Sequence, residues 1–277
     1  MWPNNNGSLA PRLTFDAYAR AMSVHYFHGH LAESREAFIE MLIREYCQFL
    51  INFASKSSGK KIIVDKITPY PGTTRHVVGQ LSKFFPNSKI IKLIRDGRDV
   101  VTSGTFDWLL KDGQGTERFK CFVKNDPAVV VEHFFDDHSI QKWATNWRET
   151  IGGVNDFDLE IRYEEMLRGL PQVLTNVFDH LGVESGTETS QRCAEEVTFE
   201  KMTGRRNGEM DATAKQRSGT CGDWKKFFTR RDGEQFHSIA GKELISLGYE
   251  SQQDWFTDLP EELAIRWDGQ PRGVSPS

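Results

Sequence analysis

The stretch KIIKLIRDGRDVVTS, residues 89–103, decides the fold class of this chain. Its first seven residues form a short apolar run that indicates a buried strand, and the DGRD turn behind it is typical of the start of a helix. The strand therefore ends on Arg95, and Ser103 lies eight residues further along, on the helix. Because open α/β sheets bind ligands at the carboxyl ends of their strands, this layout predicts a ligand site.

Arg95 has two interpretations at this position. A guanidinium binds two oxygens at once and a helix N-terminus adds partial positive charge, so that Arg95, the helix start and the Ser103 hydroxyl together suit a phosphate. Alternatively, Arg95 pairs with its own neighbours Asp96 and Asp99.

Further apolar runs extend the pattern of strands and helices. KIIVD (61–65) and FDLEIRY (157–163) predict two more strands. Helical periodicity predicts helices at about 33–54, 77–85, 140–151 and 171–182. Strand, loop and helix in repetition indicate an α/β fold with a parallel sheet flanked by helices. We expect one domain over residues 1–277, with loose ends at 1–12 and 269–277.

The composition limits the classes of partner. A net charge of −4 over 277 residues predicts no general affinity for nucleic acid. No apolar run reaches the ~18 residues that a membrane span needs. The segment 201–231 nevertheless holds nine Lys and Arg against three Asp and Glu. Such a basic segment inside an acidic protein indicates either a confined anion site or a solvated face.

The cysteines and histidines carry no metal signature. The four cysteines are scattered without CxxC spacing, which favours reduced thiols and a cytoplasmic location. His25, His28 and His30 lie close together in HYFHGH, but no matching carboxylate or cysteine pair is nearby. We therefore predict no metal site.

A second candidate anion-binding stretch is RSGTCGDWKKFFT, residues 217–229. Arg217 supplies positive charge, and the glycines, beginning with Gly219, allow the backbone to approach an anion closely.

These two stretches together resemble the sulfotransferase family that uses 3′-phosphoadenosine 5′-phosphosulfate (PAPS). In that family an R-x(7)-S element and an R-x-G-x-x-G-D-W-K element jointly hold the 3′-phosphate of the cofactor. The resemblance implies this role for Arg95, Ser103, Arg217 and Gly219. Many cytosolic members have lysine between the arginine and the glycine of the second element, where this chain has Ser218.

Two intermediate stretches resemble the same family. IRYEEM implies a place near the adenine for Tyr163, and EVTFEKM implies that Phe199 stacks on the adenine ring. Alone, both side chains would be interpreted as core aromatics. The resemblance covers residues 60–250 and implies a three-layer, P-loop-NTPase-like α/β fold related to nucleotide kinases.

The catalytic residues are implied less completely. Lys66, in DKITP, resembles the lysine that family members keep at a strand end, where its ammonium reaches the bridging oxygen; the alternative is a surface lysine. Many members have a histidine base two residues later, where this chain has Thr68, whose hydroxyl is too weak a base. Other branches use a glutamate on a helix, for which Glu33 and Glu36 are candidates.

The family's loop for the 5′-phosphosulfate, P-x-S-G-T-T, has no counterpart before DKITP. YPGTT (70–74) has similar letters but follows the lysine, so we interpret it as a helix start capped by Thr73 or Thr74. We therefore expect a sheet without its first βα unit, with weak nucleotide binding and slow or absent sulfuryl transfer, or else a divergent member of the family.

The sequence thus favours a sulfotransferase that moves a sulfuryl group from PAPS to a hydroxyl or amine. The alternative is a non-catalytic or truncated protein that binds adenosine 3′,5′-bisphosphate. A kinase is disfavoured because G-x-x-x-x-G-K-[ST] is absent. We place acceptor contacts in the aromatic, irregular segment 105–138. KKFFTRRDGE resembles the family's dimerisation motif, with Arg230 in place of valine, and this makes a homodimer a weak expectation.

Overall fold

The computed structural model describes residues 33–67 and 74–263. The chain divides into two compact units, 1–68 and 69–277. The first contains helix α2 (Arg35–Ser58), in agreement with the helix predicted at about 33–54. The Ser34 hydroxyl caps its start by accepting the N–H of Ala37 at 3.1 Å, and Gly59, in the left-handed region with φ 66°, ends it.

Residues 61–65, predicted as a strand, form none in this structure. Their side chains are exposed, that of Val64 to 81%. An extended apolar run becomes a strand only where a neighbouring strand takes up its N–H and C=O groups. No strand among residues 33–67 and 74–263 does so, since β1 and β2 pair only with each other. The prediction is therefore wrong here, because an apolar pattern specifies a propensity and not a partner.

The two other predicted strands are confirmed in shortened form. β1 (Ile91–Ile94) and β2 (Leu159–Arg162) run parallel and pair from their first residues to their last. Asp158 fixes their start, because its carboxylate accepts the N–H of Ile90 at 2.6 Å while its own N–H donates to the carbonyl of Ile90 at 2.8 Å. The parallel pairing places the carboxyl ends of both strands at one edge, where Arg95 follows β1.

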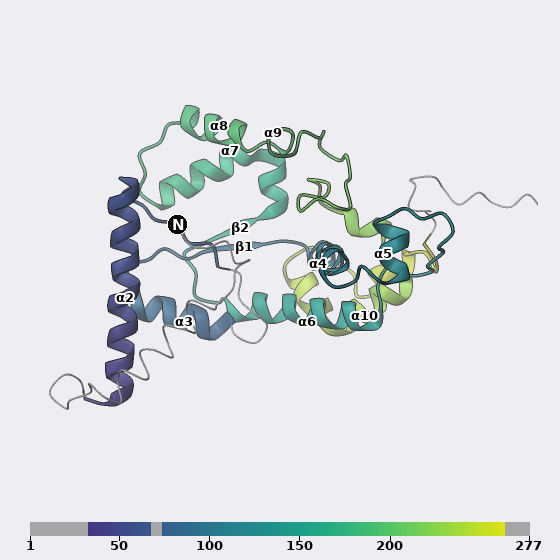
Figure 1. The fold of residues 1–277 in the computed structure, drawn as a ribbon, viewed down its shortest axis with the longest axis horizontal. Helices are drawn as coiled ribbons and strands as arrows, with labels where there is room; N and C mark the ends of the chain where they lie inside the picture. The colour runs from purple at the N-terminus through teal and green to yellow at the C-terminus, as the bar shows by residue number, and fades with distance from the viewer. Residues whose placement is uncertain (1–32, 68–73, 264–277) are drawn as a thin grey trace, which may run out of the picture. The chain divides into compact units, whose positions relative to one another are not determined.

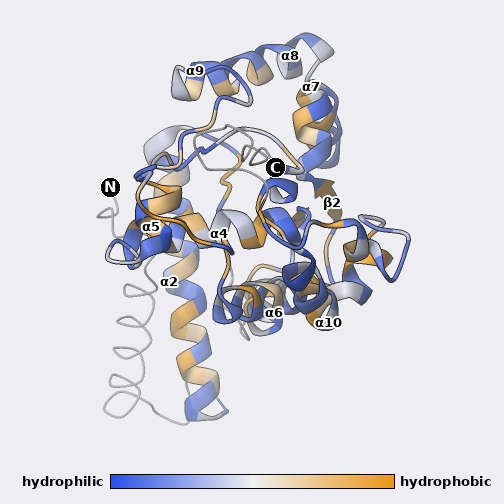
Figure 2. Ribbon diagram, turned by 90° about the vertical axis from the view of Figure 1, so that its right-hand side faces the viewer, coloured by the Kyte–Doolittle hydropathy of each residue, from blue (hydrophilic) through white to orange (hydrophobic). Residues whose placement is uncertain are grey.

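Helices flank this strand pair on both sides. The second unit contains α3 (Thr74–Phe84), α4 (Gly97–Lys111), α5 (Glu117–Phe122), α6 (Asp137–Gly153), α7 (Tyr163–His180), α8 (Thr187–Glu196), α9 (Phe199–Thr203), α10 (Arg230–Ser246) and the 3₁₀ turns η1 (Asp223–Lys226) and η2 (Trp255–Asp258). In Figure 1, α7 and α8 lie on one side of β1 and β2, and α6 and α10 lie on the other; Figure 2 shows the same separation. This arrangement confirms the α/β class.

Within the described ranges, no helix has the length and apolar character that would let it cross a membrane.

Helix α7 begins earlier than the sequence predicts. Its periodicity indicated a start at Pro171, whereas the structure begins the helix at Tyr163 and breaks it at Gly169, with φ −162° and ψ 60°. Proline has no N–H and its ring clashes with the preceding turn, so the helix breaks at Gly169, two residues before the predicted start. The additional turns carry Glu164 to the edge of the sheet, where it joins the candidate site.

The core of the second unit is aromatic. The ring centre of Phe134 lies 4.7 Å from those of Phe106, Phe135 and Phe227. The segment 105–138, where we predicted acceptor contacts, thus gives several of its aromatic rings to the core. It is also more regular than predicted, because it includes the end of α4 and all of α5. The acceptor contacts themselves stay a prediction.

Helix α4 packs on α6 through two pairs of glycine and tryptophan. A Cβ atom on Gly97 would lie 2.6 Å from the ring of Trp147, and one on Gly104 would lie 2.7 Å from the ring of Trp143. Trp147 also donates its indole N–H to the carbonyl of Arg95 at 3.0 Å. The two tryptophans pack in or against the core, as predicted, and they hold α4 next to the end of β1.

We expect Gly104→Ala to lower the free energy of unfolding by about 1–3 kcal/mol, because its methyl group would force α4 away from Trp143. Gly152→Ala is the matched control: it lies in α6 with open space around it, and alanine is favoured over glycine in a helix by up to about 1 kcal/mol. Urea unfolding of both variants measures the difference. A stabilising or neutral effect of Gly104→Ala would contradict the close contact of α4 with α6.

Candidate functional site

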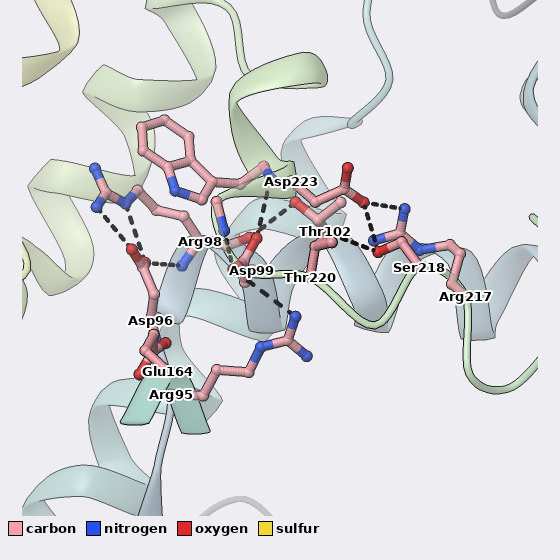
Figure 3. Close-up of polar contacts among 12 residues, drawn as sticks. Arg95, Asp96, Arg98, Asp99, Thr102, Glu164, Arg217, Ser218, Thr220 and Asp223 are labelled. Carbon is pink, nitrogen blue, oxygen red and sulfur yellow. Dashed lines mark hydrogen bonds and ion pairs between the residues drawn. The ribbon is translucent and has the colours of Figure 1, made fainter. Parts of the chain in front are cut away.

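The turn between β1 and α4 forms the first half of the candidate site (Figure 3). Asp96 caps α4, accepting the N–H of Arg98 at 2.9 Å. The guanidinium carbon of Arg95 lies 4.5 Å from the ring centre of Tyr163, and its Nη2 lies 3.8 Å from Oδ2 of Asp99. The Nε of Arg95 is buried and has no hydrogen-bond partner among the described residues. Arg95 thus retains a donor beyond its pairing with Asp99.

The 217–224 loop forms the second half. Arg217 is buried and makes an ion pair through Nη1 with Asp223, and its guanidinium carbon lies 4.5 Å from the ring centre of Phe106. Its Nε is likewise buried, with no hydrogen-bond partner within the part of the chain that the structure describes. The hydroxyl of Ser218 lies 3.0 Å from that of Thr220.

Asp99 joins the two halves (Figure 3). Its buried carboxylate accepts the N–H of Gly222 at 2.7 Å and the N–H of Trp224 at 3.0 Å. Asp99 and Gly222 are 123 positions apart in the sequence. One carboxylate at the start of α4 therefore holds the 217–224 loop and also faces Arg95.

Burial and neighbouring charges shift the pKa values of Asp99 and Arg217. Burial raises the pKa of Asp99, although Arg95 and the two amides act against it. Burial lowers the pKa of Arg217, against the effect of Asp223, and the positive charge of Arg95 adds to the lowering. Two guanidinium groups that repel each other, each with a spare buried N–H, form an arrangement that a phosphate dianion would stabilise.

The carboxylate of Asp223 keeps Arg217 in place. Burial alone would raise the pKa of Asp223, but the cations of Arg217 and Lys226 outweigh it and hold the pKa below its usual value. Nζ of Lys226 lies 2.9 Å from Oδ1 of Asp223. Asp223 is therefore ionised in the folded protein and fixes Arg217 beside the core.

Arg98, the second arginine of the turn, has a structural role. It is 2% exposed, and its guanidinium carbon lies 3.8 Å from the Trp224 ring centre and 4.7 Å from that of Trp255. Nε and Nη2 donate to the Asp96 carboxylate at 3.0 and 2.7 Å, and Nη1 pairs with Glu250. These contacts leave Arg98 enclosed, so that it fastens Trp224 to α4 and does not face a ligand.

Four of the residues predicted for the site meet in two pairs. Arg95 lies against Tyr163, as described above. Gly219 has φ 66°, in the left-handed region, and a Cβ atom on it would collide with the ring of Phe199. The ring predicted to hold adenine therefore packs directly on the loop predicted to hold phosphate, and only glycine leaves room for this contact.

Ser103 and Lys66 complete the set of predicted site residues. Ser103 is half-buried on α4, and among the contacts of the described residues none joins it to Arg95 or Arg217. Lys66 is exposed and belongs to the first unit. Their predicted roles stay predictions. The predictions about His25, His28 and His30, about Thr68 and about residues 70–73 fall outside the described residues, as do the predicted loose ends.

Sequence reasoning missed Glu164. Its Oε1 accepts the N–H of Asp96 at 2.9 Å, and its Oε2 accepts the hydroxyl of Tyr249 at 3.1 Å. Burial, with the negative charge of Glu164, raises the pKa of Tyr249, which stays protonated as the donor. The available signal was position: Glu164 follows β2 as Asp96 follows β1, and parallel strands end at the same edge.

The fold and this geometry define an α/β protein in which the Asp99 carboxylate faces Arg95, at the carboxyl end of a parallel strand, and binds the loop that carries Arg217. A family model of the sulfotransferase domain matches residues 19–248, and the chain belongs to the sulfotransferase family. The match confirms the resemblance inferred from the motifs and begins about forty positions before the region in which they lie.

Individual relatives are distant. The chain is 27% identical over 204 residues to sulfotransferase 2A6 of Mus musculus, covering 68% of each chain. It is 26% identical over 196 residues to sulfotransferase 2A1 of Homo sapiens, covering 66% of this chain and 61% of the relative. A crystal structure of mouse sulfotransferase SULT7A1 complexed with PAP aligns with 18% identity and a TM-score of 0.43 over 60% of each chain. The chain thus spans about two thirds of the relatives that it matches.

Proposed function

We propose that this protein transfers a sulfuryl group from PAPS to a hydroxyl or amine acceptor. The observation that carries the proposal is that Asp99 faces Arg95 and also binds the loop that carries Arg217. Arg95 and Arg217 belong to two distant stretches of sequence that both match the family's phosphate-binding elements. The alternative, a protein that binds adenosine 3′,5′-bisphosphate without catalysis, shares this site.

In this proposal the 3′-phosphate binds between Arg95 and Arg217. Each has a buried Nε–H group to donate, and charge-assisted hydrogen bonds to phosphate are the strong ones. Ser103, on α4, and the backbone at Gly219 add polar contacts. The adenine lies by Tyr163 and Phe199, whose rings already pack on the two phosphate-binding elements.

PAPS supplies an activated sulfuryl group. The acceptor oxygen or nitrogen forms a bond to sulfur while the bond from sulfur to the bridging phosphate oxygen breaks, and the acceptor proton passes to a base. As in phosphoryl transfer, most of the rate comes from positioning and from stabilising charge. Lys66 is the proposed cation for the bridging oxygen, and Glu33 and Glu36 stay the candidates for the base.

Turnover of radiolabelled PAPS with a panel of phenols, alcohols, amines and carbohydrates tests the proposal on the full chain. We expect slow transfer of labelled sulfate to at least one acceptor, and loss of this transfer in Lys66→Ala with nucleotide binding retained. Binding of adenosine 3′,5′-bisphosphate without transfer to any acceptor would favour the non-catalytic alternative. A chain that binds neither nucleotide would refute both.

A cytoplasmic location and a homodimer also belong to this proposal. In the proposed dimerisation motif, Thr229 caps α10 together with Asp232, and Arg230 pairs with Glu261 of the same chain. Sedimentation of the full chain tests the homodimer.

A further inference from the structure

Arg205, in the turn after α9, contacts both the adenine side and the phosphate side of the proposed site. Its Nη1 donates to the carbonyls of Glu209 and Arg217, each at 2.8 Å, and its Nη2 donates to the carbonyl of Gln216. Its guanidinium carbon lies 5.1 Å from the ring centre of Phe199. One side chain therefore contacts the ring that packs on Gly219 and the backbone that carries Arg217.

The backbone around Arg205 continues this contact. The N–H of Gly208 donates to the carbonyl of Ser218, and the N–H of Asp211 donates to the carbonyl of Arg217, both at 2.9 Å. Three successive carbonyls, of residues 216, 217 and 218, are thus bound by the segment that follows α9. The chain at Arg217 is held through its carbonyl, while its guanidinium pairs with Asp223.

The chemistry of this contact requires arginine. A guanidinium presents its N–H donors in a rigid planar fork, which can reach three carbonyl oxygens in different directions and still stack on a ring. A lysine ammonium is a point charge on a flexible stem and cannot do both. The basic segment 201–231 indicates an anion site or a solvated face, but Arg205 within it donates to carbonyl oxygens.

We propose that Arg205 is a positioning residue: it holds the Phe199 ring and the Arg217–Gly219 backbone in one arrangement that is ready to bind the nucleotide of PAPS. Arg205 acts through these groups and does not itself touch the cofactor. Without it, the carbonyls of Glu209 and Gln216 lose this donor and that of Arg217 keeps only the N–H of Asp211, so both the adenine contact and the 3′-phosphate contact become less ordered. This inference rests on the proposed function.

The test measures the binding of adenosine 3′,5′-bisphosphate and of AMP to the full chain by calorimetry. We expect Arg205→Ala to weaken binding of the bisphosphate by at least about tenfold, a loss of about 1.4 kcal/mol. Binding of AMP should also weaken, because the Phe199 ring is no longer held in place. Arg205→Lys keeps the charge but not the fork, and should stay close to Arg205→Ala. The control Arg206→Ala removes an exposed neighbouring charge and should change affinity by less than about twofold.

The outcomes are distinct. Wild-type affinity in Arg205→Ala would overturn the inference, and so would equal losses in Arg205→Ala and Arg206→Ala, since charge alone would then account for them. Thermal unfolding without nucleotide identifies a variant that does not fold; if Arg205→Ala is such a variant, wild-type affinity in Arg205→Lys overturns the inference. Absence of bisphosphate binding in the wild-type chain would instead refute the proposed function itself.

Discussion

Arg217→Ala is expected to weaken binding of adenosine 3′,5′-bisphosphate by tenfold or more, because a charge-assisted contact to phosphate contributes about 1.5–3 kcal/mol. Binding of AMP, which has no 3′-phosphate, should change far less. This contrast follows from the proposed contact of the 3′-phosphate with Arg217, whose buried Nε–H no described group accepts. Calorimetric titration with both nucleotides measures it.

Lys226→Ala is the matched control for this substitution. Lys226 pairs with the same carboxylate, Asp223, but its side chain is 54% exposed. Solvent-exposed ion pairs contribute only about 0–1 kcal/mol, so this variant should bind both nucleotides nearly as the wild type does. If Arg217→Ala lost equal affinity for the two nucleotides, Arg217 would not recognise the 3′-phosphate. Equal losses of affinity in Arg217→Ala and Lys226→Ala would show that Arg217 acts only through its positive charge.

Asp99→Ala is expected to lower the free energy of unfolding by about 3–5 kcal/mol, the effect of removing one partner of a buried charged pair. The substitution leaves the N–H groups of Gly222 and Trp224 without their acceptor and removes the negative charge that faces Arg95. It also releases the 217–224 loop from α4, so nucleotide binding should fall with stability. Urea unfolding measures the first effect, and titration below the unfolding transition measures the second.

Asp107→Ala provides the comparison on the same helix. Its carboxylate pairs with Lys111 one turn later at 2.7 Å, and its side chain is 54% exposed. Exposed pairs of this spacing contribute about 0.3–0.5 kcal/mol, so this variant should unfold almost as the wild type does. A small effect of Asp99→Ala, close to that of Asp107→Ala, would mean that Asp99 does not hold the two halves of the site together.

Local features of the sequence were sufficient for much of the fold. The strands at β1 and β2 and the helices predicted at about 77–85 and 140–151 follow from apolar spacing, which acts over a few residues. The two arginine elements could be found in the same way, since their residues stand at short, fixed intervals. The family match is consistent with that interpretation.

Tertiary structure decided which of these residues work together. Of the two arginines in the turn after β1, Arg98 is enclosed by Trp224 and Trp255, while Arg95 keeps a spare donor. Residues 61–65 have the apolar pattern of a strand but no neighbouring strand in the described chain. Burial and hydrogen-bond partners depend on groups that are remote in sequence, and no local pattern specifies them. Asp99, which binds the amides of the 217–224 loop from 123 positions away, is the clearest case.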